Sequence, residues 1–204
     1  MSAFTQKFIS EMVGDIYQSV FDLTQLSKVL ERIQHELRCN SYLLRMQDSS
    51  DYSVHFNLSS GYEAKWSRAY QEHFYRVDPY PEALKRFPVG MHSADSMITN
   101  QFLRSEYYND FLRPQNKYHC IGGHILRDKR NFILLGFQRH RGSQTFQDQD
   151  LHLLQQVEPH IKRVLLLNQQ HSELLSLQRI EEQVLNSLAR QSRNQKMPHC
   201  RIFS

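Results

Sequence analysis

Cysteine is scarce in this chain, and its three cysteines cannot form a disulfide framework. Cys39, Cys120 and Cys200 are odd in number, lie far apart and include no Cys-x-x-Cys pair. No apolar run approaches the roughly 20 residues that span a bilayer. The N-terminal segment also lacks the long apolar stretch and the small-residue cleavage site of a secretory signal. We therefore expect a cytoplasmic protein without disulfides.

Sequence motifs of the common enzyme classes are missing as well. There is no Gly-x-Ser-x-Gly elbow, no Walker loop, no Gly-x-Gly-x-x-Gly turn and no His-Glu-x-x-His. His119 and His124 lie five residues apart on a predicted strand, and this odd separation directs them to opposite faces. His160 and His171 stand about 16 Å apart along a predicted helix. We therefore expect no enzyme, no catalytic residue, no metal site and no cofactor.

The formal charge of +4 is concentrated at the C-terminal end of the chain. Residues 190–204 contain four basic and no acidic residues, so the rest of the chain is close to neutral. This segment is either a solvated basic tail or a phosphate-binding arm. It is too short for a helix-turn-helix with a basic recognition helix. We therefore expect no specific DNA binding by this chain alone.

Apolar periodicity predicts helices separated by two pairs of strands. The predicted order is helix at 4–20 and 24–37, strand at 41–46 and 54–58, helix at 63–77, 82–86 and 99–112, strand at 118–127 and 131–138, and a long helix from about 145. Gly122 and Gly123 inside a predicted strand indicate a bulge or a close backbone approach. This order predicts an α+β fold, an α-β-α sandwich with a central antiparallel sheet that resembles GAF and PAS domains, and a long C-terminal helix.

The C-terminal helix carries a second apolar stripe after a polar interruption at 168–173. The stripe consists of Leu174, Leu177, Ile180, Val184 and Leu188. The sequence thus divides into an α/β domain at 1–167, a helical arm at 168–192 and a flexible basic tail at 193–204. An apolar stripe on a lone helix is marginal in water and must be covered. Either a second copy covers it in a homodimer, or the helix folds back onto its own domain.

Aromatic residues with polar groups gather between residues 61 and 79. Trp66 and Tyr70 are four residues apart and share a helix face, Tyr62 leads into that face, and Asp78 ends the segment. An indole N–H, two hydroxyls and a carboxylate beside ring surface can orient a small amide or carbonyl ligand in an apolar cleft. Alternatively, the two rings belong to the core and Asp78 is a turn residue.

This segment resembles the ligand-facing motif of the LuxR-type quorum-sensing regulators. In that family a Tyr four residues before a Trp, a Tyr four residues after it and a downstream Asp-Pro form the polar end of a pocket for acyl-homoserine lactones. The resemblance therefore implies that Tyr62, Trp66, Tyr70 and Asp78 bind a ligand inside an α-β-α sandwich. Here Asp78 lies one residue closer to Trp66 than is usual, and no second Trp follows.

A broader resemblance covers roughly residues 3–190. Residues 106–114 (EYYNDFLRP) and 157–165 (VEPHIKRVL) resemble LuxR-type regulators with GAF-like sensors. It implies a small-molecule sensor domain that forms a homodimer and contacts DNA only through a helix-turn-helix output domain, which this sequence lacks. The chain is then either a fragment or a stand-alone sensor. The alternative function is a ligand-free module for protein interaction or dimerisation.

Overall fold

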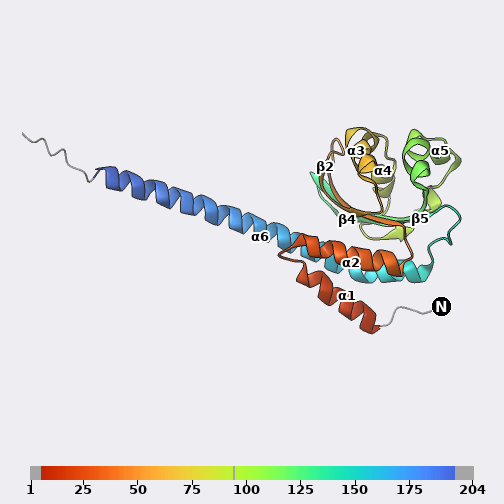
Figure 1. Ribbon diagram of the computed structural model, residues 1–204, viewed down its shortest axis with the longest axis horizontal. Coiled ribbons are helices and arrows are strands. Elements are labelled where there is room, and N and C mark those ends of the chain that lie inside the picture. The colour runs from red at the N-terminus through yellow and green to blue at the C-terminus, as the bar shows by residue number, and fades with distance from the viewer. Residues whose placement is uncertain (1–5, 94, 196–204) are drawn as a thin grey trace, which may run out of the picture.

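A five-stranded antiparallel sheet forms the centre of the molecule (Figure 1). The computed structural model describes residues 6–93 and 95–195, and its description leaves out the side chains of residues 96, 180–182 and 184–195. The strand order is β2-β1-β5-β4-β3. The strands are β1 (Ser41–Asp48), β2 (Val54–Ser60), β3 (His92–Ser93), β4 (Lys117–Arg127) and β5 (Asn131–His140).

Helix α2 (Leu23–Glu36) and the first part of α6 (Asp148–Gln195) cover one face of the sheet, and α1 (Gln6–Gln18) packs against these two helices. Helix α2 begins where the Asp22 side chain accepts a hydrogen bond from the Thr24 backbone N–H. Its buried residues recur at spacings of three and four, which places one apolar stripe against the sheet. These residues are Leu26, Val29, Leu30 and Ile33.

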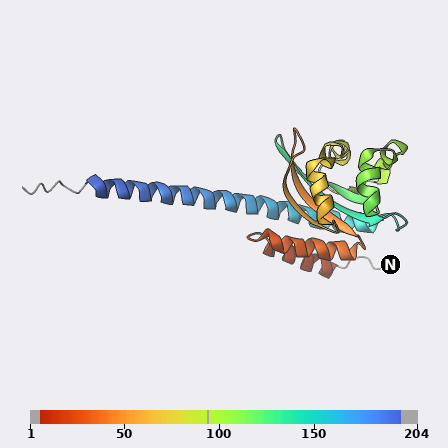
Figure 2. The ribbon, with the colours of Figure 1, turned by 45° about the horizontal axis from the view of Figure 1, so that its top comes forward.

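Short helical elements cover the opposite face, around which the sheet curves (Figures 1 and 2). They are α3 (Ala64–Glu72), η1 (Phe74–Arg76), α4 (Tyr80–Leu84), η2 (Asp95–Met97), α5 (Asn100–Leu103), the π-helix η3 (Tyr107–Leu112) and η4 (Arg113–Gln115). The predictions of single helices at 63–77 and 99–112 were therefore wrong in their length. In the π-helix the adjacent residues Tyr107 and Tyr108 are both buried, and a widened turn allows both rings to pack inward.

Both predicted hairpins are present, and β1 pairs with β5 to join them into one sheet. Strand β3 was not predicted, because two residues carry no periodic pattern. It lies against β4 where glycine permits a close backbone approach, as the Gly-Gly pair indicated. A Cβ atom at Gly123 would lie 1.8 Å from the carbonyl oxygen of Gly90. The register irregularities of β4 fall elsewhere, at 117–119 and 124–126.

Helix α6 continues unbroken for 48 residues and projects far beyond the sheet (Figures 1 and 2). Near the point where α6 leaves the body, the Asn168 Nδ2 donates a hydrogen bond of 2.8 Å to the carbonyl of Val20, just after α1, and the His171 ring lies 5.0 Å from that of Phe21. On the projecting part, Leu174 is 61% exposed and Leu177 is 62% exposed. The predicted stripe also includes Ile180, Val184 and Leu188, whose side chains lie outside the described part of the structure.

The described helices show an α+β sandwich with an antiparallel sheet and a long C-terminal helix, which confirms the predicted fold class. Within residues 6–93 and 95–195, no helix combines the length and the apolar character needed to cross a bilayer. The predicted basic tail lies outside the description from residue 196 onward.

Candidate functional site

The fold brings Tyr70 and Asp78 together beneath the layer of short helices. The Tyr70 hydroxyl donates a hydrogen bond of 2.9 Å to Asp78 Oδ2. Asp78 Oδ1 accepts a hydrogen bond of 2.9 Å from the backbone N–H of Tyr80, the first residue of α4. Asp78 therefore bonds both to the backbone that leads into α4 and to the side chain of Tyr70.

Trp66 and Tyr62 lie around the same cluster but do not contact Asp78. Trp66 packs edge-to-face on Phe111, with ring centroids 6.0 Å apart, and Tyr70 lies 5.6 Å from the same ring. The Tyr62 hydroxyl instead donates a hydrogen bond of 2.7 Å to Gln138 Oε1 on β5. The four predicted residues thus surround one region, and only Tyr70 and Asp78 are directly bonded to each other.

Arg45 on β1 lies at the centre of this region, and the sequence analysis missed it. Its guanidinium carbon stands 3.7 Å from the centroid of the Tyr70 ring, and its Nε donates a hydrogen bond of 3.3 Å to Asn57 Oδ1. Only 7% of the residue is exposed. A charged residue inside an otherwise apolar strand segment (SYLLRM) was the available signal, since such a residue is seldom buried without a reason.

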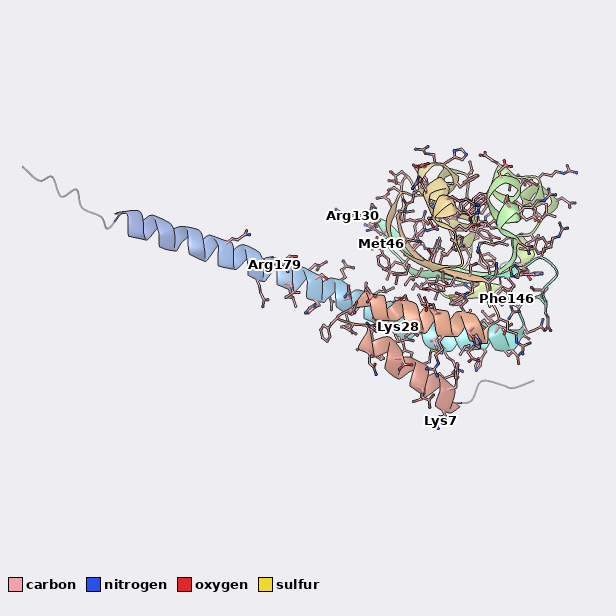
Figure 3. All side chains as sticks on the ribbon, viewed as in Figure 1. Lys7, Lys28, Met46, Arg130, Phe146 and Arg179 are labelled. Carbon is pink, nitrogen blue, oxygen red and sulfur yellow. The ribbon has the colours of Figure 1, made fainter. Side chains whose placement is uncertain are left out.

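A cavity of about 40 Å³ lies between the sheet and the short helices. Its floor includes Gly122 and Gly136, and a Cβ atom at Gly136 would meet no atom closer than 3.8 Å. Its roof includes Tyr80 and Tyr107, and its polar lining is Arg45, Asp78 and Gln138. Tyr62, Trp66 and Tyr70 border a smaller hollow of about 10 Å³ on the other side of Arg45. Side chains fill the rest of the layer (Figure 3).

The pKa values of Asp78, Arg45 and Tyr70 are all raised, but by different causes. Burial raises the pKa of the Asp78 carboxyl, against the hydrogen bond from Tyr80 and the nearby charge of Arg45. Burial acts to lower the pKa of Arg45, but the surrounding tyrosines and Asp78 raise it overall. Burial also raises the pKa of Tyr70, which keeps its hydroxyl protonated. The guanidinium therefore stays charged, while the carboxyl is shifted towards its neutral form.

The end of the cavity at Gln138 is held by a hydrogen-bond network. Gln138 Oε1 accepts from the hydroxyl of Ser41 at 2.9 Å as well as from Tyr62. The Lys117 ammonium group donates to the Gly61 carbonyl at 3.0 Å and lies 3.8 Å from the centroid of the Tyr62 ring. Burial lowers the pKa of Lys117 to about 7. The amide orientation of Gln138 is thus set by two hydroxyl donors.

Comparison with known proteins shows similarity at the level of the fold. No protein-family model and no curated protein sequence matches the chain. Among solved structures, the VqsR LBD domain of Pseudomonas aeruginosa superposes with a TM-score of 0.60 at 13% identity, covering 78% of this chain and 94% of that one. Escherichia coli SdiA gives a TM-score of 0.60 at 15% identity, covering 80% of this chain and 67% of SdiA.

A GAF domain also superposes on this chain, so the similarity in fold extends beyond the first two structures. The GAF3 domain of Slr1393 from Synechocystis gives a TM-score of 0.52 at 16% identity, covering 79% of this chain and 98% of that domain. The fold is therefore similar to that of GAF and autoinducer-binding domains. More particularly, the fold resembles the ligand-binding domains of LuxR regulators. At these identities the likeness concerns the fold alone.

Proposed function

We propose that this chain is the ligand-sensing domain of a LuxR-type transcriptional regulator. Its ligand binds between the sheet and the short helices, and α6 carries the signal. The observation that carries this proposal is the cavity with Arg45, Asp78 and Gln138 on its wall, enclosed by apolar and aromatic side chains. Buried polar groups that converge on an apolar hollow are typical of small-molecule sites.

Opening of the roof must accompany ligand binding, because small-molecule sites usually measure roughly 300–1,000 Å³. The roof consists of short elements, including the five-residue α4. Exposed contacts fasten α4 to the sheet, such as the hydrogen bond of 3.1 Å from Arg127 Nη1 to the Lys85 carbonyl. Exposed contacts of this kind contribute little free energy. Displacing α4 also exposes the buried side chains of Tyr80 and Leu84, so the ligand must cover that apolar surface in turn.

Strand β5 connects the cavity to the projecting helix. Gln138 lines the cavity, and the next residue, Arg139, contacts α6 through a hydrogen bond of 3.1 Å from its Nη2 to Asp150 Oδ2. Successive strand residues point to opposite faces, so a shift of β5 that accommodates a ligand also moves the attachment of α6. This is the route by which we propose that binding reaches the C-terminal helix.

Native mass spectrometry tests the ligand directly. Protein purified from its own host is expected to carry a bound molecule that is lost on denaturation. Gly136→Val is expected to abolish this extra mass, because the new side chain extends into the cavity and its Cβ meets no atom closer than 3.8 Å. Gly14→Val on the exposed face of α1 serves as the control and should retain the ligand. Retention by Gly136→Val would place the ligand elsewhere.

The cavity volume of about 40 Å³ favours a second candidate function. In that function the sandwich is a packed scaffold, and the chain is a ligand-free module for protein interaction or dimerisation. It predicts that wild-type protein from its host carries no bound molecule. It also predicts that Trp66→Ala lowers stability without loss of any binding activity.

We further propose that α6 pairs with the same helix of a second copy in a homodimer, through Leu174 and Leu177 together with Ile180, Val184 and Leu188. Helix α6 runs away from the body past Asn168, and its two described leucines of the stripe are mostly exposed (Figure 1). Such a helix is marginal in water unless its apolar stripe is covered.

Leu174→Asp combined with Leu177→Asp is expected to convert the dimer to a monomer at micromolar concentration. Two carboxylates in an apolar interface are left without partners, which strongly disfavours association. Sedimentation velocity measures the change, and Arg179→Asp serves as a control for charge on the same projecting segment (Figure 3). A wild-type monomer that the double substitution leaves unchanged would exclude the dimer.

A further inference from the structure

Two arginines in the sheet are equally buried but differ sharply in their partners. Arg45 and Arg139 are each 7% exposed. Arg139 donates hydrogen bonds to three backbone carbonyls and to the Asp150 carboxylate. Those carbonyls belong to Leu37, Gln144 and Thr145. A buried guanidinium is normally satisfied in this way, so Arg139 is explained by the fold.

The fold does not explain Arg45 in the same manner. Its hydrogen bond to Asn57 uses Nε, and among the described residues its Nη1 and Nη2 have no hydrogen-bond partner. No carboxylate of a described residue lies within 4.0 Å of it. The Tyr70 ring, 3.7 Å away, holds the plane of the guanidinium in place. Two oriented pairs of N–H donors therefore remain available.

Both hollows of the site border this guanidinium. Arg45 lines the cavity of about 40 Å³ and the smaller one of about 10 Å³. A charge that has little contact with water and no paired carboxylate is costly, and an anion that enters the cavity lowers that cost. Asp78 compensates only weakly, because it forms no ion pair with Arg45 and burial shifts it towards its neutral form. The guanidinium of Arg45 is thus left without a carboxylate in ion-pair contact among the described residues.

We infer that the ligand is a small organic anion whose carboxylate binds the guanidinium of Arg45, an inference that rests on the proposed sensing function. A carboxylate matches the planar fork of an arginine with two parallel hydrogen bonds. One guanidinium compensates one negative charge, which favours a carboxylate over a doubly charged phosphate. The remainder of the ligand is apolar, because Leu43, Leu84 and Leu134 line the same cavity.

A matched pair of probes tests the charge. N-Octanoylglycine and N-octanoylglycinamide have the same size and differ in carrying a carboxylate or a neutral amide. Isothermal titration calorimetry on the full chain is expected to show at least about tenfold tighter binding of the acid, as a buried charge pair implies. Arg45→Met is expected to remove this preference. Arg45→Lys, which keeps the charge but loses the planar fork, is expected to weaken it.

Arg32→Met is the control. Arg32 lies in α2, on the opposite face of the sheet, and pairs with Asp15, so this substitution should leave the preference for the acid over the amide intact. Equal binding of acid and amide by the wild type would overturn the inference and leave the sensing function standing. A preference for the acid over the amide that survives in Arg45→Met would also overturn the inference. Binding of neither probe, together with no molecule retained from the host, would contradict the sensing function and the inference with it.

Discussion

Arg139→Met is expected to lower the free energy of unfolding by about 3–5 kcal/mol, the usual effect of breaking a buried ion pair. The substitution leaves the Asp150 carboxylate buried without its cation. It also removes the donors of two hydrogen bonds to the Leu37 carbonyl, at 2.6 and 2.9 Å, which join α2 to the sheet. Because Asp150 lies in the first turn of α6, the loss also loosens that helix from β5.

Denaturant unfolding followed by circular dichroism, at one protein concentration, measures this change. Arg45→Met is the matched control, since it makes the same substitution at an equally buried arginine. It is expected to change the free energy of unfolding by less than about 1 kcal/mol or to raise it, because a buried charge with few partners costs more than it contributes. Equal destabilisation by the two substitutions would show that Arg45 is a structural arginine.

Gly123→Ala is expected to destabilise the protein by about 3 kcal/mol or more, at the upper end of the effects of overpacking. The new Cβ would lie 1.8 Å from the carbonyl oxygen of Gly90. A backbone oxygen cannot rotate away as a side chain can, so the segment before β3 must leave the sheet. The Gly90 N–H would then lose its hydrogen bond of 2.9 Å to the His124 carbonyl.

Hydrogen exchange of residues 90–93 and denaturant unfolding together detect this detachment. Gly136→Ala is the control on the neighbouring strand, because its Cβ meets only ordinary contacts at 3.8 Å or beyond. That variant should be neutral or slightly stabilising, since alanine lowers the entropy of the unfolded chain. Gly122→Ala, whose Cβ would stand 2.7 Å from the Leu135 carbonyl oxygen, should fall between the two. The reverse order would contradict this account of the β3 edge.

Part of the candidate site was predictable because its geometry is local. Trp66 and Tyr70 share a helix face, and Asp78 closes the same segment, so the approach of Tyr70 to Asp78 follows from one short stretch of chain. Their role in ligand binding stays a prediction. Tyr62 was placed in the same group, but its hydroxyl bonds to Gln138, which is 76 residues away. No local pattern contains that partner.

Local periodicity determined the types and the order of the main elements. Apolar spacing within each segment predicts the helices α1 and α2. Apolar spacing together with turn residues predicts the hairpins β1–β2 and β4–β5. The short helices between β2 and β4 were poorly predicted. Their conformation depends on packing several adjacent aromatic rings, such as Tyr107 and Tyr108, against the sheet. Tertiary contacts override helix propensity there.

Only the tertiary structure decided which charged residues are satisfied and which are free. Arg45 and Arg139 both lie on strands, and nothing in the neighbouring sequence distinguishes them. Arg139 meets a helix end and the first turn of α6, whereas Arg45 meets a tyrosine ring and a cavity. The sequence by itself determined an α+β sandwich with a long helix, because periodicity is local. The chemistry of the cavity was decided by the fold, because a buried charge depends on groups that distant segments bring to it.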